Sequence, residues 1–79
     1  MTLSHILEAM KQNTQKIASF LEISEDIVQF WIDNPITLWD IGIVEVGIIS
    51  HVAEIKPSTF LEALSTEYPF ETLHEIKES

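Results

Sequence analysis

The chain has 79 residues, which suffice for one domain spanning residues 1–79 and leave no room for a second. Thirteen acidic residues face four lysines and no arginine, so the net charge is −9. This charge disfavours phosphate backbones and anionic lipids as partners and favours basic protein surfaces. The hydrophobic content of 46% excludes a disordered acidic tail, and the lack of cysteine excludes disulfides and thiolate chemistry.

The N-terminal residues have neither the basic segment nor the long apolar stretch of a signal peptide. The most apolar run, residues 41–49, contains Glu45 and is shorter than the roughly 18 apolar residues of a membrane span. A chain without cysteine also fits a reducing compartment. We therefore expect a cytoplasmic protein that does not associate with membranes.

The first two helices follow from the spacing of apolar residues. A helix is predicted from Leu3 to about Gln12, because apolar residues recur there at i, i+3, i+4 and i+7. Asn13 and Thr14 carry side-chain oxygens suited to capping a second, short helix. The apolar stripe of that helix comprises Ile17, Ala18 and Leu21.

A third helix is predicted to begin after Ser24. The serine hydroxyl can cap this helix, and the two carboxylates that follow favour the positive end of its dipole. Asn34 and Pro35 are expected to end it, because the residue before proline resists the helical conformation. Its buried face is expected to hold Ile27, Val28 and Trp31.

Residues 37–56 are predicted to form one central helix. A capping box would open it, with Thr37 bonding forward and Asp40 reaching back. Isoleucine and valine cover most of its surface, as expected of a helix packed on several sides. A pair of strands is the alternative for residues 41–55, because β-branched residues favour strands and each of the two glycines weakens a helix by about 1 kcal/mol.

Short helices are predicted over residues 57–77. Pro57 suits the first turn of a helix, and Tyr68 and Pro69 interrupt the pattern before a final amphipathic segment. The apolar residues of these segments are Phe60, Leu61, Leu64, Phe70, Leu73 and Ile76. Together the elements predict an all-helical, compact bundle of about five or six short helices.

The stretch from Thr14 to Trp31 resembles the helix-turn-helix unit of phage and bacterial regulators, transposases and small terminase subunits. Those proteins commonly read I-A-x-x-L-G-V-S-x-x-T-V-x-x-W, and the matching residues here are Ile17, Ala18, Leu21, Ile23, Ser24, Val28 and Trp31. The resemblance implies a helix-turn-helix unit over residues 14–34, in a bacterial or phage protein. Where the family usually has glycine, this chain has Glu22, and a left-handed backbone there would cost about 1 kcal/mol.

The second helix of such a unit normally sends polar and basic side chains into the major groove of DNA. Between Lys16 and Lys56, however, this chain has no lysine or arginine. The same interval holds seven carboxylates, those of Glu22, Glu25, Asp26, Asp33, Asp40, Glu45 and Glu54. DNA binding requires several cations placed against phosphates, so we do not expect direct nucleic-acid binding.

The acidic face is therefore the expected working surface of a non-enzymatic interaction or regulatory protein. It would contact a basic protein, and would mask a nucleic-acid-binding partner by presenting carboxylates in place of phosphates. The residues assigned to this surface are Glu22, Glu25, Asp26, Gln29 and Asp33. The alternative is a dimeric helix-turn-helix transcriptional regulator, with Lys11 and Lys16 near the DNA backbone and Gln29 reading bases.

Apolar residues between the third helix and the next are more numerous than one short helix and turn can hide. Phe30, Ile32 and Trp39 are the main ones, beside Trp31 and Ile36. They are expected to be core contacts covered by the fourth and fifth helices, or contacts in a homodimer. The sequence leaves both open.

No catalytic, cofactor or metal site is predicted. The motif Glu71-x-x-His74 has the spacing used in di-iron bundles, but such a site needs a second copy of the motif, which the sequence lacks. His74 and His5 are expected to be solvated or to face a partner, and His51 to lie in the core or to form a pH-sensitive contact. Ser50 is adjacent to His51 on a helix, so the two side chains should point different ways. Gly42 and Gly47 are expected to allow close approach of neighbouring helices.

Overall fold

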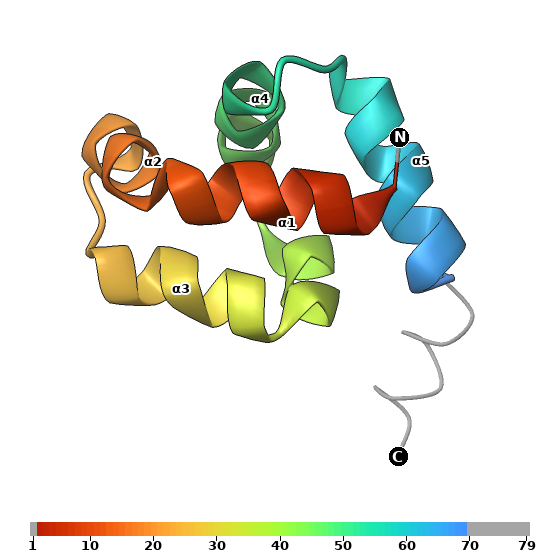
Figure 1. Cartoon of the computed structure of the whole chain (residues 1–79), viewed down its shortest axis with the longest axis horizontal. Helices are drawn as coiled ribbons and strands as arrows, with labels where there is room; N and C mark the ends of the chain where they lie inside the picture. Colours follow the sequence, from red (N-terminus) through yellow and green to blue (C-terminus); the bar gives the residue numbers. More distant parts are fainter. Residues whose placement is uncertain (1, 70–79) are drawn as a thin grey trace.

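The computed structural model describes residues 2–69, which form five α-helices and one 3₁₀-helix (Figure 1). The elements are α1 (Leu3–Gln12), α2 (Thr14–Leu21), α3 (Glu25–Asp33), the 3₁₀-helix η1 (Pro35–Asp40), α4 (Ile43–Val52) and α5 (Pro57–Glu67). The described residues contain no strand. The predicted all-helical class is therefore confirmed.

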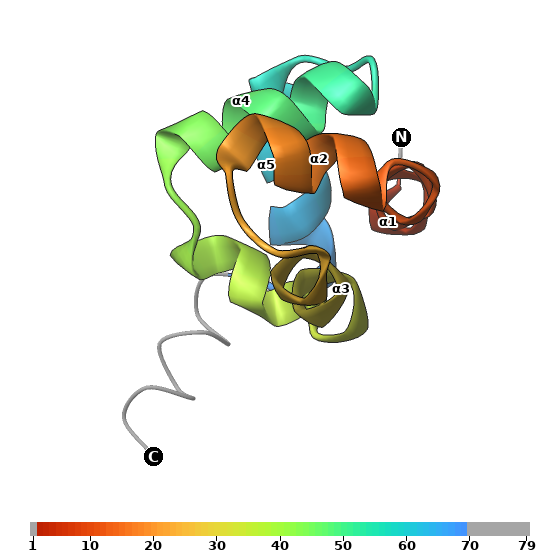
Figure 2. The same cartoon turned by 90° about the vertical axis from the view of Figure 1, so that its left-hand side faces the viewer.

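Two helices, α1 and α3, lie side by side and run in opposite directions (Figure 1). The short helix α2 joins them at one end, and η1 lies beyond the other end of α3. In the perpendicular view α1 and α3 are both seen nearly end-on (Figure 2). Helix α4 lies behind α2 in this view and packs against it. Helix α5 packs against α1, α4 and η1, so it closes the bundle.

Every helix contributes side chains to one core. Phe60 of α5 is the largest fully buried residue. The other buried apolar residues are Leu3, Ile6, Met10, Ile17, Ala18, Val28, Leu38, Ile49, Ala63 and Leu64. Burial of these side chains from six short elements supplies most of the driving force for folding, because helices of this length are marginal in isolation.

Helix α1 has the predicted bounds, and its buried residues belong to the predicted stripe. The junction with α2 differs from expectation. Asn13 Nδ2 donates to the Ala9 carbonyl at 2.7 Å, and Thr14 Oγ1 donates to the Lys11 carbonyl at 2.9 Å. These side chains therefore satisfy the last carbonyls of α1, whereas the prediction that they cap the N-terminus of α2 was wrong.

The predicted central helix over residues 37–56 was also wrong, because it is divided into η1 and α4. Thr37 Oγ1 donates backward to the Asn34 carbonyl at 2.7 Å, so its hydroxyl does not open a helix. Pro35 at the first position of η1 starts the local helical turn earlier than predicted. The chain then extends at Ile41 and Gly42, and α4 begins one residue later.

Helix α4 is less enclosed than predicted. It is helical, which rules out the strand alternative for its residues, but Ile43 is 90% exposed and Val44 is 63% exposed. The glycines do not permit close helix packing either. A Cβ added at Gly47 would meet no atom within 4 Å, and one added at Gly42 would meet only the side chain of Glu45.

Ser50 is buried in α4, at 1% exposure, and its hydroxyl has no hydrogen-bond partner among the described residues. Removing an unsatisfied buried hydroxyl relieves a desolvation cost of about 1–3 kcal/mol. We therefore expect Ser50→Ala to raise the free energy of unfolding by about 1 kcal/mol. Urea denaturation checks this, with the exposed Ser58→Ala as control. Destabilisation by Ser50→Ala would show that the hydroxyl has a partner in solution.

Helix α5 begins at Pro57, as predicted, and ends at Glu67 before Tyr68 and Pro69. With 11 residues it is longer than the short helix expected there. The predicted final segment, which contains Phe70, Leu73, His74 and Ile76, lies outside the described residues.

Candidate functional site

The turn between α2 and α3 consists of residues 22–24. Glu22 adopts a left-handed conformation, with φ 56° and ψ 43°, at the position where the sequence led us to consider one. The backbone N–H of Ile23 donates to the Ala18 carbonyl at 3.0 Å. This bond closes the end of α2 and directs the chain into α3.

Replacing Glu22 with glycine is expected to stabilise the protein by about 0.5–1 kcal/mol, because glycine adopts the left-handed region without a Cβ penalty. Thermal unfolding at neutral pH measures the change. Glu22→Gln is the matched control, since it removes the same charge and keeps the Cβ. Equal melting temperatures for the two variants would show that the stabilisation comes from the loss of charge. The left-handed backbone at residue 22 would then not be strained.

The five residues assigned to the acidic face are all exposed, on the turn and along α3. Glu25 and Asp26 occupy the first turn of α3, where carboxylates stabilise the positive end of the helix dipole. Gln29 Nε2 donates to Asp33 Oδ1 at 3.0 Å. Ser24 stands at the N-cap, as predicted, but its hydroxyl makes no capping bond, so the predicted cap is absent.

None of the carboxylates on this face forms an ion pair with another described residue. The three described lysines lie elsewhere: Lys11 at the end of α1, Lys16 on α2 and Lys56 before α5. Lys16 lines a separate hollow with His51 and Glu54, at the C-terminal end of α4. The face on α3 is therefore acidic, uncompensated by neighbouring cations.

The buried face of α3 contains fewer residues than predicted. Val28 is fully buried and Trp31 is partly buried, but Ile27 is 43% exposed. The prediction that Ile27 is buried was therefore wrong. Phe30 is 53% exposed, so α3 presents an apolar edge beside its acidic face.

Phe30 and Trp31 line an open groove of about 410 Å³ between α3, η1 and the start of α4. Its other lining residues are Thr37, Asp40, Ile41, Gly42 and Glu45. Figure 2 shows the backbone connection that rises from η1 to the start of α4. The sequence did not reveal this groove, because the lining residues from Thr37 to Glu45 were predicted to lie within one continuous helix.

Glu45 lies at the third position of α4, with its side chain folded back toward Gly42. A Cβ added at Gly42 would lie 2.6 Å from Glu45 Oε2. This position places the carboxylate at the N-terminus of α4, where the helix dipole favours a negative charge. The groove thus has a fixed anionic side chain in its wall.

Ile32 and Trp39 pack against the core, whereas Phe30 is left uncovered by the described residues. Trp39 Nε1 donates to the Tyr68 carbonyl at 2.8 Å, which ties η1 to the end of α5. Of the three residues assigned to core or dimer contacts, Phe30 is therefore the most exposed.

The two described histidines, His5 and His51, belong to no group that could hold a metal ion. His51 is exposed, so its predicted place in the core was wrong, while the adjacent Ser50 is buried and points elsewhere. His5 is exposed, and its Nδ1 lies 2.9 Å from Thr2 Oγ1. Within residues 2–69 no three histidine or carboxylate groups are placed to hold a metal ion, and Glu71 and His74 lie outside the described residues.

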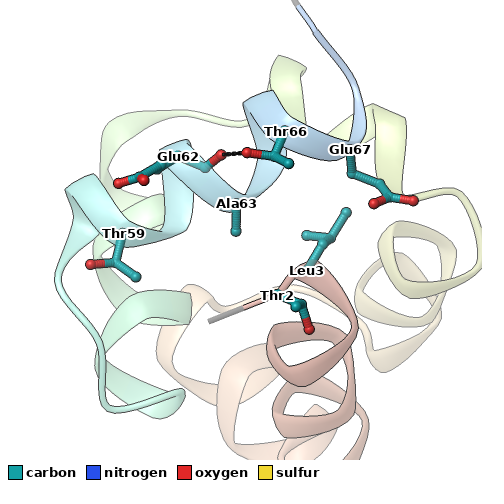
Figure 3. A pocket seen from close by; sticks show the side chains of 7 residues that line it. All are labelled: Thr2, Leu3, Thr59, Glu62, Ala63, Thr66 and Glu67. Atoms are coloured by element: carbon teal, nitrogen blue, oxygen red, sulfur yellow. Dashed lines mark hydrogen bonds between the residues drawn. The ribbon is translucent and has the colours of Figure 1, made fainter.

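A second hollow, of about 290 Å³, lies between the start of α1 and α5 (Figure 3). Leu3 and Ala63 point into it, and the remaining lining residues are Thr2, Thr59, Glu62, Thr66 and Glu67. Thr66 donates its hydroxyl to the Glu62 carbonyl within α5. Most polar residues that line this hollow are exposed to solvent, and Thr59 is partly buried.

Comparison with protein-family models, with curated proteins and with solved structures gave no match for this chain. No helix in the described part of the chain is long and apolar enough to cross a membrane.

Proposed function

We propose that this chain is an acidic, non-enzymatic regulatory protein of the cytoplasm that binds a basic region of another protein. Its contact surface is the second helix of a helix-turn-helix unit formed by α2 and α3. One observation carries the proposal: four exposed carboxylates and one amide lie along the turn and α3, and within residues 2–69 none of these carboxylates forms an ion pair. They belong to Glu22, Glu25, Asp26, Asp33 and Gln29.

A surface of this kind attracts lysine- and arginine-rich segments over a distance of about one Debye length, which is roughly 8 Å at physiological salt. Such segments commonly bind nucleic acid through its phosphates. The carboxylates of α3 occupy the position of those phosphates in the complex. Binding therefore masks the partner's nucleic-acid-binding surface.

The competing function is a dimeric DNA-binding regulator with the same helical unit. Two observations weigh against it. Lys16 lines a hollow at the end of α4 together with Glu54, and Gln29 Nε2 already donates to Asp33 Oδ1 at 3.0 Å. A regulator of this kind would bind DNA with an affinity that falls steeply as salt increases.

Capture from native host extract tests the proposal, with protein and nucleic acid both identified at low and moderate salt. The bait is wild type or Glu25→Lys/Asp26→Lys. The matched control, Glu8→Lys/Glu62→Lys, makes the same charge change at exposed positions on α1 and α5. We expect wild type and control to retain a basic protein that the α3 variant loses. Recovery of DNA fragments sharing a sequence would instead establish the regulator.

A further inference from the structure

The groove beside α3 combines apolar and anionic chemistry. Phe30 and Ile41 provide apolar surface, and Trp31 provides a partly buried indole. Ile43, which follows Gly42 at the start of α4, is 90% exposed. Large apolar side chains left this open in a small domain mark an interaction surface.

Carboxylates surround this apolar surface. Asp40 and Glu45 line the groove itself. Asp26 lies one helical turn before Phe30, and Asp33 lies one turn after it. Among the described residues no lysine or arginine lines the groove, and Glu45, Asp26 and Asp33 place negative charge in and beside it.

We propose that this groove binds a basic amphipathic helix of the partner protein. Apolar side chains of that helix pack on Phe30, Trp31 and Ile41, and its lysines or arginines face the surrounding carboxylates. This inference rests on the proposed function, because it specifies the form of the basic segment. It adds that charge alone does not suffice for recognition, since the apolar residues provide the anchor.

A second copy of this chain is a poorer occupant for an electrostatic reason. Each copy carries a net charge of −9, and pairing two grooves would bring the carboxylates near Phe30 together. Like charges opposed across an interface cost several kcal/mol. A basic helix replaces that repulsion with attraction.

Two synthetic peptides test the proposal with purified protein. Both carry the same lysines on a helical sequence; one has leucines at i, i+3, i+4 and i+7, and the other has glutamines there. The readout is the indole N–H signal of Trp31 in a nitrogen-15 spectrum. Trp39 serves as an internal reference, because its indole is already bonded to the Tyr68 carbonyl.

We expect the leucine peptide to shift the Trp31 signal and to bind at least tenfold more tightly than the glutamine peptide. Phe30→Ser should abolish that difference, and its circular dichroism spectrum verifies folding. Phe30 is 53% exposed, so the substitution spares the core. Leu61→Ser, at the similarly exposed Leu61 of α5, is the matched control and should preserve the difference.

The outcomes separate the groove from the acidic face. Equal affinity of the two peptides, weakened in both cases by Glu25→Lys/Asp26→Lys, would overturn the groove and leave the proposed function standing. Binding unaffected by that charge reversal would contradict the proposed function itself. Absence of binding by both peptides would overturn the amphipathic-helix proposal. A wild-type dimer that Phe30→Ser dissociates would identify a second copy as the occupant and overturn it as well.

Discussion

Replacing Phe60 with alanine is expected to reduce the free energy of unfolding by about 3–5 kcal/mol, which is comparable with the whole stability of a small domain. Phe60 is fully buried, on a helix that contacts α1, α4 and η1. Its removal leaves a cavity where these elements meet. We therefore expect loss of cooperative thermal unfolding, measured by circular dichroism.

Two variants control for this result. Phe60→Leu retains most of the buried apolar volume and should fold, with a smaller loss of about 1–2 kcal/mol. Leu61→Ala changes the next residue of the same helix, which is 42% exposed, and should have little effect. A cooperative Phe60→Ala protein with nearly unchanged stability would contradict the position of α5 in the core.

Reversing two charges on α3 is expected to have the largest effect on binding. Glu25→Lys/Asp26→Lys replaces two exposed carboxylates with two cations, which a basic partner would repel. We expect affinity for the captured partner to fall by about 30- to 150-fold, equivalent to about 2–3 kcal/mol. Calorimetry at several salt concentrations measures both the affinity and its electrostatic component.

The same charge change on α1 and α5, in Glu8→Lys/Glu62→Lys, should reduce affinity much less. Its net charge equals that of the α3 variant, so the comparison separates a local contact from the general field of the protein. Equal losses in the two variants would mean that the partner responds only to net charge. The assignment of the contact to α3 would then fail.

Local signals in the sequence predicted several element boundaries correctly. The apolar stripe of α1 set its bounds, Asn34 and Pro35 ended α3, and Pro57 began α5. These signals act through backbone geometry and helical periodicity, which depend on neighbouring residues alone. The exposure of the acidic side chains on α3 followed from the same periodicity.

Signals that depend on tertiary context were misread. The Thr37 hydroxyl could accept a bond from a following N–H or donate one to a preceding carbonyl. It donates to the Asn34 carbonyl. The predicted central helix is divided at Ile41 and Gly42, where the backbone is extended, and the groove beside α3 lies at this division. Ile27 illustrates the same limit, because whether it is buried depends on which helix packs beside it, and the sequence does not specify that neighbour.

Amide chemical-shift mapping on nitrogen-15-labelled protein, with the captured partner added, locates the contact surface directly. We expect the largest shifts at residues 22–33 and at the groove residues of η1 and α4. The shifts at α5 and at Lys11 should be small. Large shifts at Lys11 and Lys16 on addition of DNA, with residues 22–33 unperturbed by any basic protein, would contradict the assignment of the contact to α3.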